Sequence, residues 1–440
     1  MFLSLLRYKN FSSISTATLI SNLCKTIVWL TVLCSSMSFA KDHKFTNVYN
    51  NDMGHFYQLK LEQGLSLDVF VPSNSKDIRL PVLYVMDGQH YLYNAIGFQQ
   101  TLSAGIHTMT ASPAFIVVGI NTAKLVQNSK RQRAQLLNSN SAQLSKTLVE
   151  HIMPKVDNAF HTSGQNLYFG WQFAASFGLS LFNDYPQAFQ GLLLASGPYY
   201  SESQIARTKD TLALNKGLGV KVYLSLGEKE KHALVGHEGL IEVFKAAGRA
   251  TVDWNYHYHD NYSGHIDHFT TPFDALSKGL TWQFNDYHDL TFYSLQDVEA
   301  FGGVTAIVDY FKRRAKKYGV PETVGEVAHF TLFRYALEEN NYQAFQEFER
   351  YLGEYKINNR FTSYAKFFAE HDNVERAIKV LKAGIKQHPQ VHQLSGELAK
   401  LYLIERNTKQ AVKHFQQALD KAKADEMAVA QYQQQLDRLL

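Results

Sequence analysis

Short apolar runs that alternate with helical patterns constrain the fold of this chain more than any other feature. The runs cover residues 81–86 (PVLYVM), 114–120 (AFIVVGI), 191–195 (GLLLA) and 221–226 (KVYLSL). Runs of this length without polar alternation are typical of strands that are covered on both faces. Because segments with helical spacing separate them, such as residues 144–160, the chain is expected to form a doubly wound, mostly parallel α/β sheet.

Two further segments predict strands at the outside of this sheet. Residues 56–71 contain two alternating runs around Glu62-Gln63-Gly64, which is a hairpin signal. Residues 252–258 alternate aromatic or aliphatic side chains with polar ones, which predicts an outer strand with one wetter face. A polar segment that ends near Ala142 shows no periodicity.

Strand signals cease at about Phe301. Ala344, Ala377 and Ala411 lie 33 and 34 residues apart, each within a helical pattern. A period of about 34 residues with small residues where helices cross resembles tetratricopeptide repeats, and an irregular helical bundle is the alternative. The predicted domains are therefore an α/β domain at 41–290, a helical connector at 291–320 and a smaller, all-helical repeat domain at 321–440.

The first 40 residues have the pattern of a secretory signal peptide. They hold three basic residues and no acidic one, then an apolar stretch at 26–33, then small residues up to Ala40. The apolar stretch is too short for a comfortable membrane span. Both cysteines, Cys24 and Cys34, lie in this leader, so a chain cleaved after Ala40 has no disulfide and no cysteine metal site. A periplasmic or secreted protein without a membrane span is expected.

The composition excludes two classes of protein. With 45% apolar residues the chain can bury more than one core, which excludes a disordered protein. The formal net charge is only +4 and no basic run occurs, so a nucleic-acid partner is not expected.

Residues 166–178 (NLYFGWQFAASFG) predict a sharp strand-turn-helix elbow, because an apolar run stops at Gly170 and a helical pattern follows. In α/β-hydrolases such an elbow carries G-x-S-x-G, which lifts a serine oxygen above the sheet edge. Here Gln172 stands in the serine position, with Ala174 and Ala175 as the neighbouring small residues. An amide cannot act as the nucleophile of ester hydrolysis, because its nitrogen lone pair is delocalised into the carbonyl.

The order and spacing of several motifs resemble the putative-esterase family of α/β-hydrolases, which contains enterobactin-type siderophore esterases and esterase D. The resemblance covers roughly residues 45–285, and bacterial members with a helical repeat tail are known. The motifs are PVLYVMDGQHY, AFIVVGI, LVEHIMPKVDNAF, LYFGWQFAASFGL, YPQAF, SLGEKE and DHFTTPFDALSKGL.

The resemblance implies the other members of a catalytic triad. The family's histidine falls on His268, and its acid falls on Glu230 in the sequence Gly-Glu-Lys-Glu, with Glu228 as the alternative. The backbone N–H groups of Phe173 and Gly88 would be the oxyanion donors. The chain departs from the family in the glutamine, in the elbow alanines, and in the absence of the usual arginine-rich stretch after residue 120.

These residues leave several functions open. The first is a pseudoenzyme that binds an ester-like or siderophore-like ligand, with a repeat tail that binds a protein. The second is an active carboxylic-ester hydrolase that uses Ser176, because residues 174–178 can be read as a shifted G-x-S-x-G. The third is weak hydrolysis by a water molecule that Gln172 and His268 position.

A ligand pocket is expected at the carboxyl ends of the strands, where open α/β sheets bind ligands. Its predicted lining residues are Asp87, His90, Tyr91, Trp171 and Tyr199.

Four histidines lie close together in the sequence, at His257, His259, His265 and His268. A zinc or copper site would need three convergent ligands. No cysteine or carboxylate spacing completes such a set, so neither a metal nor another cofactor is expected. His257 and His259 are instead predicted to lie on a solvated strand face.

Overall fold

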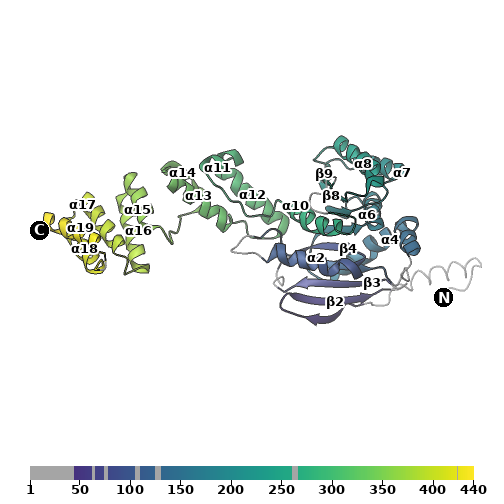
Figure 1. The fold of residues 1–440 in the computed structure, drawn as a ribbon, viewed down its shortest axis with the longest axis horizontal. Coiled ribbons are helices and arrows are strands. Elements are labelled where there is room, and N and C mark those ends of the chain that lie inside the picture. Colours follow the sequence, from purple (N-terminus) through teal and green to yellow (C-terminus); the bar gives the residue numbers. More distant parts are fainter. Residues whose placement is uncertain are drawn as a thin grey trace, which may run out of the picture.

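The computed structural model describes residues 44–61, 65–73, 78–104, 110–123, 130–259, 266–423 and 425–440. The predicted signal peptide and the Glu62-Gln63-Gly64 turn lie outside the described residues. The described chain forms a sheet covered by helices, from which an all-helical arm extends (Figure 1). Both features of the predicted fold class, a mostly parallel sheet and a helical region after it, are confirmed.

Nine strands form one sheet within the described residues, in the order β1-β2-β3-β5-β4-β6-β7-β8-β9. The pairs from β1 to β5 along this order are antiparallel, and those from β5 to β9 are parallel. The segment 56–71 forms the antiparallel pair β2–β3, and β9 lies at the outer edge, as its alternation predicts. The strands are β1 (Thr46–Asn50), β2 (Gly54–Lys60), β3 (Ser66–Pro72), β4 (Leu80–Met86), β5 (Ile116–Asn121), β6 (Thr162–Trp171), β7 (Gly191–Ala195), β8 (Val220–Leu226) and β9 (Val252–Tyr258).

Helices cover both faces of the sheet because the central strands are apolar on both sides. In β4, Val82, Tyr84 and Met86 face one core, while Leu83 and Val85 face the other. The first core is shared with α4 (Ser141–Lys146), η3 (Thr147–Ile152), α5 (Met153–Ala159), α6 (Phe173–Asp184), α7 (Glu202–Leu214) and α8 (Leu234–Ala247). The second is shared with α2 (Gly88–Ser103), η5 (Ala275–Gly279) and α10 (Leu280–Gln283).

The described part of the polar segment before Ala142 is helical from residue 130, despite its lack of period. It contains α3 (Lys130–Ala134) and η2 (Gln135–Ser139). Leu137 is buried in the core beside the sheet, so tertiary packing supplies the stability that the local pattern lacks.

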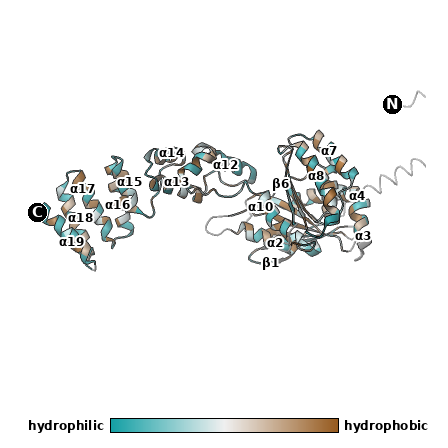
Figure 2. Ribbon diagram, turned by 45° about the horizontal axis from the view of Figure 1, so that its top comes forward, coloured by the Kyte–Doolittle hydropathy of each residue, from teal (hydrophilic) through white to brown (hydrophobic). Residues whose placement is uncertain are grey.

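The arm consists of helices that hide their apolar faces from solvent. Hydrophobic and hydrophilic stretches alternate along the helices of the arm (Figure 2). The helices are α11 (Leu295–Phe301), α12 (Gly303–Tyr318), α13 (Glu326–Glu338), α14 (Tyr342–Leu352), α15 (Phe361–Glu370), α16 (Val374–Gln387), α17 (His392–Ile404), α18 (Thr408–Lys421) and α19 (Glu426–Leu439).

Three helical hairpins of the arm share one turn design. Asn341, Asn373 and Asn407 each cap the second helix of a hairpin by accepting a hydrogen bond from a backbone N–H three residues later. In each case the residue before the asparagine has a positive φ. Relative to these caps, Phe345 rather than Ala344 is the counterpart of Ala377 and Ala411. The tetratricopeptide character of the hairpins stays a prediction.

The arm is joined to the sheet domain through the end of α12. Tyr318 is 2% exposed and its ring lies 5.1 Å from that of Tyr287. Its hydroxyl donates a 2.6 Å hydrogen bond to Asp286. None of the helices in the described part of the chain is both long and apolar enough to cross a bilayer.

Candidate active site

The elbow after β6 holds Gln172 in a strained backbone conformation, with φ 58° and ψ −124°. For a residue other than glycine, such a conformation costs about 1–3 kcal/mol of free energy, and it persists only where the surroundings impose it. The Gln172 N–H donates a 2.9 Å hydrogen bond to the Ala195 carbonyl at the end of β7. A side chain at Gly170 would approach the Ala174 carbonyl to 2.4 Å, so the turn is closed as tightly as a nucleophile elbow requires.

Gln172, His268 and Glu230 lie in a row at the carboxyl edge of the sheet. Nε2 of Gln172 is 2.7 Å from Nε2 of His268, and Nδ1 of His268 is 2.6 Å from Oε1 of Glu230. These contacts fit a neutral imidazole that carries its proton on Nδ1, donates it to the carboxylate, and accepts from the glutamine amide. The structure therefore brings together the nucleophile position, the histidine and the favoured acid of the predicted triad.

Glu230 is fixed by donors on its second oxygen. Oε2 accepts hydrogen bonds from Ser196 Oγ at 2.5 Å and from the Gly227 N–H at 2.7 Å. Burial raises the pKa of Glu230, but the hydrogen bonds from His268, Ser196 and Gly227 outweigh it and hold the pKa below its ordinary value. Glu228, the alternative acid, is also buried, and its Oε2 has no hydrogen-bond partner among the described residues.

Arg133 of α3 also belongs to this site, although it is absent from the predicted one. Its guanidinium donates to Asp87 Oδ2 through Nε at 3.0 Å and Nη2 at 2.5 Å, and to Gln172 Oε1 through Nη1 at 3.3 Å. The sequence Lys130-Arg131-Gln132-Arg133 was the available signal, and the prediction that no arginine-rich stretch follows residue 120 overlooked it. It follows a segment without periodicity. The guanidinium fixes the amide orientation, because it places the oxygen of Gln172 toward Arg133 and the nitrogen toward His268.

Residues 60–283 match the model of the family described as putative esterase, which is just over half of the chain. This chain belongs to the putative-esterase family. The predicted resemblance is thereby confirmed, and the match contains Gln172, His268 and Glu230.

Solved structures similar to this esterase-family chain include three with esterase or hydrolase names. An IroE-like serine hydrolase from Shewanella oneidensis is 14% identical, has a TM-score of 0.48, and matches over 70% of this chain and 98% of its own. Siderophore hydrolase EstB from Aspergillus nidulans is 15% identical, with a TM-score of 0.43 and coverages of 55% and 98%. The ferric enterobactin esterase of Salmonella typhimurium is 14% identical, with a TM-score of 0.37 and coverages of 53% and 60%. No curated protein sequence matches the chain.

Phe173 and Gly88, the predicted oxyanion donors, each begin a helix. Phe173 is the first residue of α6 and Gly88 the first of α2, so neither N–H has an intrahelical acceptor. A side chain at Gly88 would come within 2.6 Å of the Gly119 backbone, which explains the glycine. Asp87, predicted as a pocket residue, is only 1% exposed, and its other oxygen accepts from Thr122 Oγ1 at 2.5 Å.

The remaining predicted pocket residues divide into two groups. Trp171 and Tyr91 lie at the site: the Trp171 indole N–H donates to the His268 carbonyl at 2.9 Å, and the two rings lie 6.0 Å apart. His90 and Tyr199 are exposed, Tyr199 at 66%, and Tyr199 packs near His232 instead.

Ser176, the alternative nucleophile, lies one turn further along α6. Its hydroxyl donates to the Tyr199 carbonyl at 3.3 Å, and its side chain is buried. Among the hydrogen bonds of the described residues, none joins Ser176 to His268.

Two of the clustered histidines lie close to a carboxylate that the spacing along the sequence does not indicate. The expectation that no metal is bound stays a prediction. His257 and His259 each place a ligand atom within 4.8 Å of one on Asp274. The sequence pattern could not show this, because α9 (Thr271–Asp274) is brought beside β9 only by the fold. Both histidines are half-buried rather than fully solvated. His265 lies outside the described residues.

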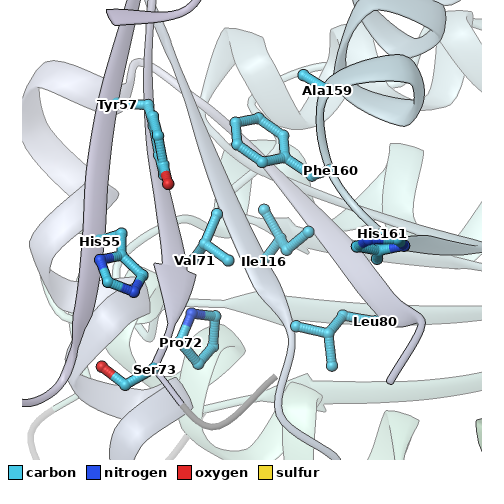
Figure 3. A pocket seen from close by; sticks show the side chains of 10 residues that line it. All are labelled: His55, Tyr57, Val71, Pro72, Ser73, Leu80, Ile116, Ala159, Phe160 and His161. Atoms are coloured by element: carbon cyan, nitrogen blue, oxygen red, sulfur yellow. The ribbon is translucent and has the colours of Figure 1, made fainter. Parts of the chain in front are cut away.

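A cavity of about 450 Å³ lies at the amino ends of the parallel strands, opposite the Gln172 site (Figure 3). Leu80 and Ile116, which line it, begin β4 and β5, whereas the Gln172 site lies at the carboxyl ends. The cavity is therefore separate from the esterase site. Its lining is His55, Tyr57, Val71, Pro72, Ser73, Leu80, Ile116, Ala159, Phe160 and His161.

Proposed function

We propose that this protein is a catalytically degenerate member of the esterase family that binds an ester-like or siderophore-like ligand without hydrolysing it. The observation that carries the proposal is the 2.7 Å contact between Gln172 Nε2 and His268 Nε2. The amide stands where a serine hydroxyl would donate to the imidazole, and it cannot attack a carbonyl.

The same contact disfavours hydrolysis by a positioned water. A water molecule needs the lone pair on His268 Nε2 as its general base, and that lone pair accepts from Gln172. Arg133 holds the amide from its other end, at 3.3 Å. Loss of the nucleophile from a triad costs on the order of 10⁶ in turnover, and only positioning and oxyanion effects remain.

Features that would bind a ligand are nevertheless retained. Phe173 and Gly88 each begin a helix, so their N–H groups have no intrahelical acceptor and could donate to a carbonyl or an anionic oxygen. Trp171 offers aromatic surface beside His268, and Tyr91 lies on the ring of Trp171. Aromatic surface with a few polar donors suits an aromatic ester of the kind found in siderophores.

Fluorophosphonate labelling tests the proposal directly. The wild type should not be phosphonylated, whereas the serine of Gln172→Ser should be phosphonylated with loss of fluoride. The variant should also cleave p-nitrophenyl acetate slowly, because His268, Glu230 and the backbone donors are in place. The matched control is His268→Ala in the Gln172→Ser background, which should lose the labelling. Labelling of the wild type that Ser176→Ala abolishes would refute the proposal and make the protein an active esterase.

Export and a protein partner complete the proposed function. The first 40 residues support cleavage after Ala40 and a periplasmic or secreted protein; intact-mass measurement of the exported chain tests this. A retained N-terminus would overturn it.

The helical hairpins support protein binding by the arm, because stacked helical pairs present extended surfaces. Cross-linking of the intact exported chain in its native compartment, compared with the chain truncated after residue 320, tests whether a partner depends on the arm.

A further inference from the structure

We propose that His257, His259 and Asp274 form a binding site for a divalent first-row transition-metal ion such as Zn²⁺. The site shares no residue with the Gln172–His268–Glu230 row. It is therefore independent of whether that row is degenerate.

The fold brings the three side chains together from two segments. His257 lies near the end of β9, and His259 is the first residue after it. Because the His259 N–H still donates to the Leu226 carbonyl of β8, the two side chains project from the same face of the sheet. Asp274 ends α9, which follows the His268 loop and packs on β8. One ligand atom of each residue lies within 4.8 Å of the other two.

The ring of His259 has a nitrogen that lacks a partner. Its Nε2 is buried, it has no hydrogen-bond partner among the described residues, and Asp274 Oδ2 lies 3.5 Å away. An imidazole with its proton on Nδ1 would direct the Nε2 lone pair at the carboxylate, which is repulsive, and one with its proton on Nε2 would have no acceptor in hydrogen-bond geometry. An unsatisfied buried polar atom costs about 1–3 kcal/mol. A cation bound by both atoms removes both penalties.

Asp274 is held in place by a second layer of polar groups. Its side chain is 1% exposed, and Oδ2 accepts hydrogen bonds from Tyr223 Oη at 3.0 Å and Ser225 Oγ at 2.9 Å. Tyr223 Oη also lies 3.1 Å from Nδ1 of His257. Partners of this kind orient metal ligands and fix the histidine tautomer.

A metal ion bound at Asp274 would repel the positive charge of Lys278. Its ammonium lies 2.8 Å from Oδ1 of Asp274, on the oxygen that does not face His259. Its side chain is 54% exposed, so it can move into solvent without burying a charge. The lysine and a metal ion can thus use different oxygens, at a cost in mutual repulsion.

The donor set selects the class of metal. Two imidazoles and a carboxylate suit Zn²⁺ and its neighbours, whereas Ca²⁺ and Mg²⁺ prefer oxygen ligands throughout. In a tetrahedral site with bonds of about 2.1 Å, two ligand atoms lie about 3.4 Å apart. Ligand atoms that lie as much as 4.8 Å apart here must therefore approach by up to about 1.4 Å, which the half-buried His257 near the end of β9 can supply by rotating its side chain. With three protein ligands, a fourth position stays open to solvent.

Calorimetric titration of the chelator-treated, full-length mature protein with Zn²⁺ tests the site. The wild type should bind one ion that His259→Gln and Asp274→Asn do not bind. Tyr223→Phe should weaken binding about 10- to 100-fold, and Lys278→Met should tighten it several-fold. His388→Ala, which removes an exposed histidine of the arm, is the matched control and should bind as the wild type does.

A second readout separates metal binding from misfolding of a variant. Saturating Zn²⁺ should raise the melting temperature of the wild type and of His388→Ala, but not of folded His259→Gln. Absence of zinc binding by the wild type would overturn the proposal. Equal zinc affinity of the wild type and His259→Gln would overturn it too.

Discussion

Arg133 and Asp87 form a pair whose charges are mostly shielded from solvent, with side-chain exposures of 18% and 2%. The arginine also donates to the carbonyl of Trp171 at 3.1 Å and to Gln172, so one side chain braces both residues that lead into α6. The strained backbone at Gln172 is thus held from the outside. This bracing explains how the elbow keeps its geometry with an amide in place of a hydroxyl.

Arg133→Met should therefore destabilise the protein by about 3–5 kcal/mol, because it leaves the buried carboxylate of Asp87 without its partner. Urea unfolding measures the change. The double variant Arg133→Met/Asp87→Asn should recover part of the loss, since it removes the uncompensated charge.

The control is Arg207→Met, which breaks a surface pair with Asp184 in which the arginine is 54% exposed. That change should cost about 1 kcal/mol or less. An equal cost for the two arginine variants would show that the Arg133–Asp87 pair does not brace the elbow.

The site residues differ in how far the sequence reveals them. Gln172, Glu230 and His268 each follow a strand or a recognisable motif, so motif order predicts that they meet. Arg133 and Asp274 carry no local pattern. Their contacts depend on where α3 and α9 pack, which is decided by tertiary contacts that a single sequence does not display.

Among the elements, α8 carries a fully buried histidine. His237 lies between the rings of Tyr200 and Tyr256, at 4.8 Å and 5.5 Å, and its Nε2 lies 3.1 Å from the carbonyl of Gly197 after β7. Burial lowers the pKa of His237 from 6.5 to about 4, more than the Gly197 carbonyl and the charge of Glu230 raise it.

A lowered pKa in the folded state gives stability that is fully present above the unfolded pKa of 6.5 and is lost as the pH falls toward 4. The wild type should lose about 3 kcal/mol through this residue across that window. His237→Gln keeps a donor for Gly197 but cannot titrate, so its unfolding free energy should fall less. Urea unfolding over the pH range measures the difference, with His388→Gln as the exposed control. Identical pH profiles for wild type and His237→Gln would contradict the burial argument.

Strands were easier to predict than helices for a physical reason. The strands β4, β7 and β8 are covered on both faces, so unbroken apolar runs mark them. The helical stretch predicted at 144–160 is real but contains the π-helical turn η3. A change of hydrogen-bond pattern within a helix leaves no mark on a 3.6-residue period.

At the scale of the whole molecule, α12 contributes to two cores. Ile307 and Phe311 are fully buried in the core of the arm, while Tyr318 at the other end packs against Phe284 and Tyr287 of the sheet domain. Local periodicity predicts that residues 291–320 are helical. It cannot show with which core each turn packs, so the domain boundaries at 290 and 320 stay predictions.

Limited proteolysis should cut the exposed, non-helical segment at 319–325 between α12 and α13. The two fragments should still elute together, because α11 and α12 remain in the first fragment and pack on α13 and α14 of the second. Phe311→Ala removes a fully buried ring, at a cost of about 3–5 kcal/mol, and should let the fragments separate on size exclusion. Tyr293→Ala removes a ring that is 72% exposed and should not. If the nicked wild type separates at once into a folded sheet domain and a folded arm, α12 belongs to the sheet domain alone and its packing on the arm contributes little.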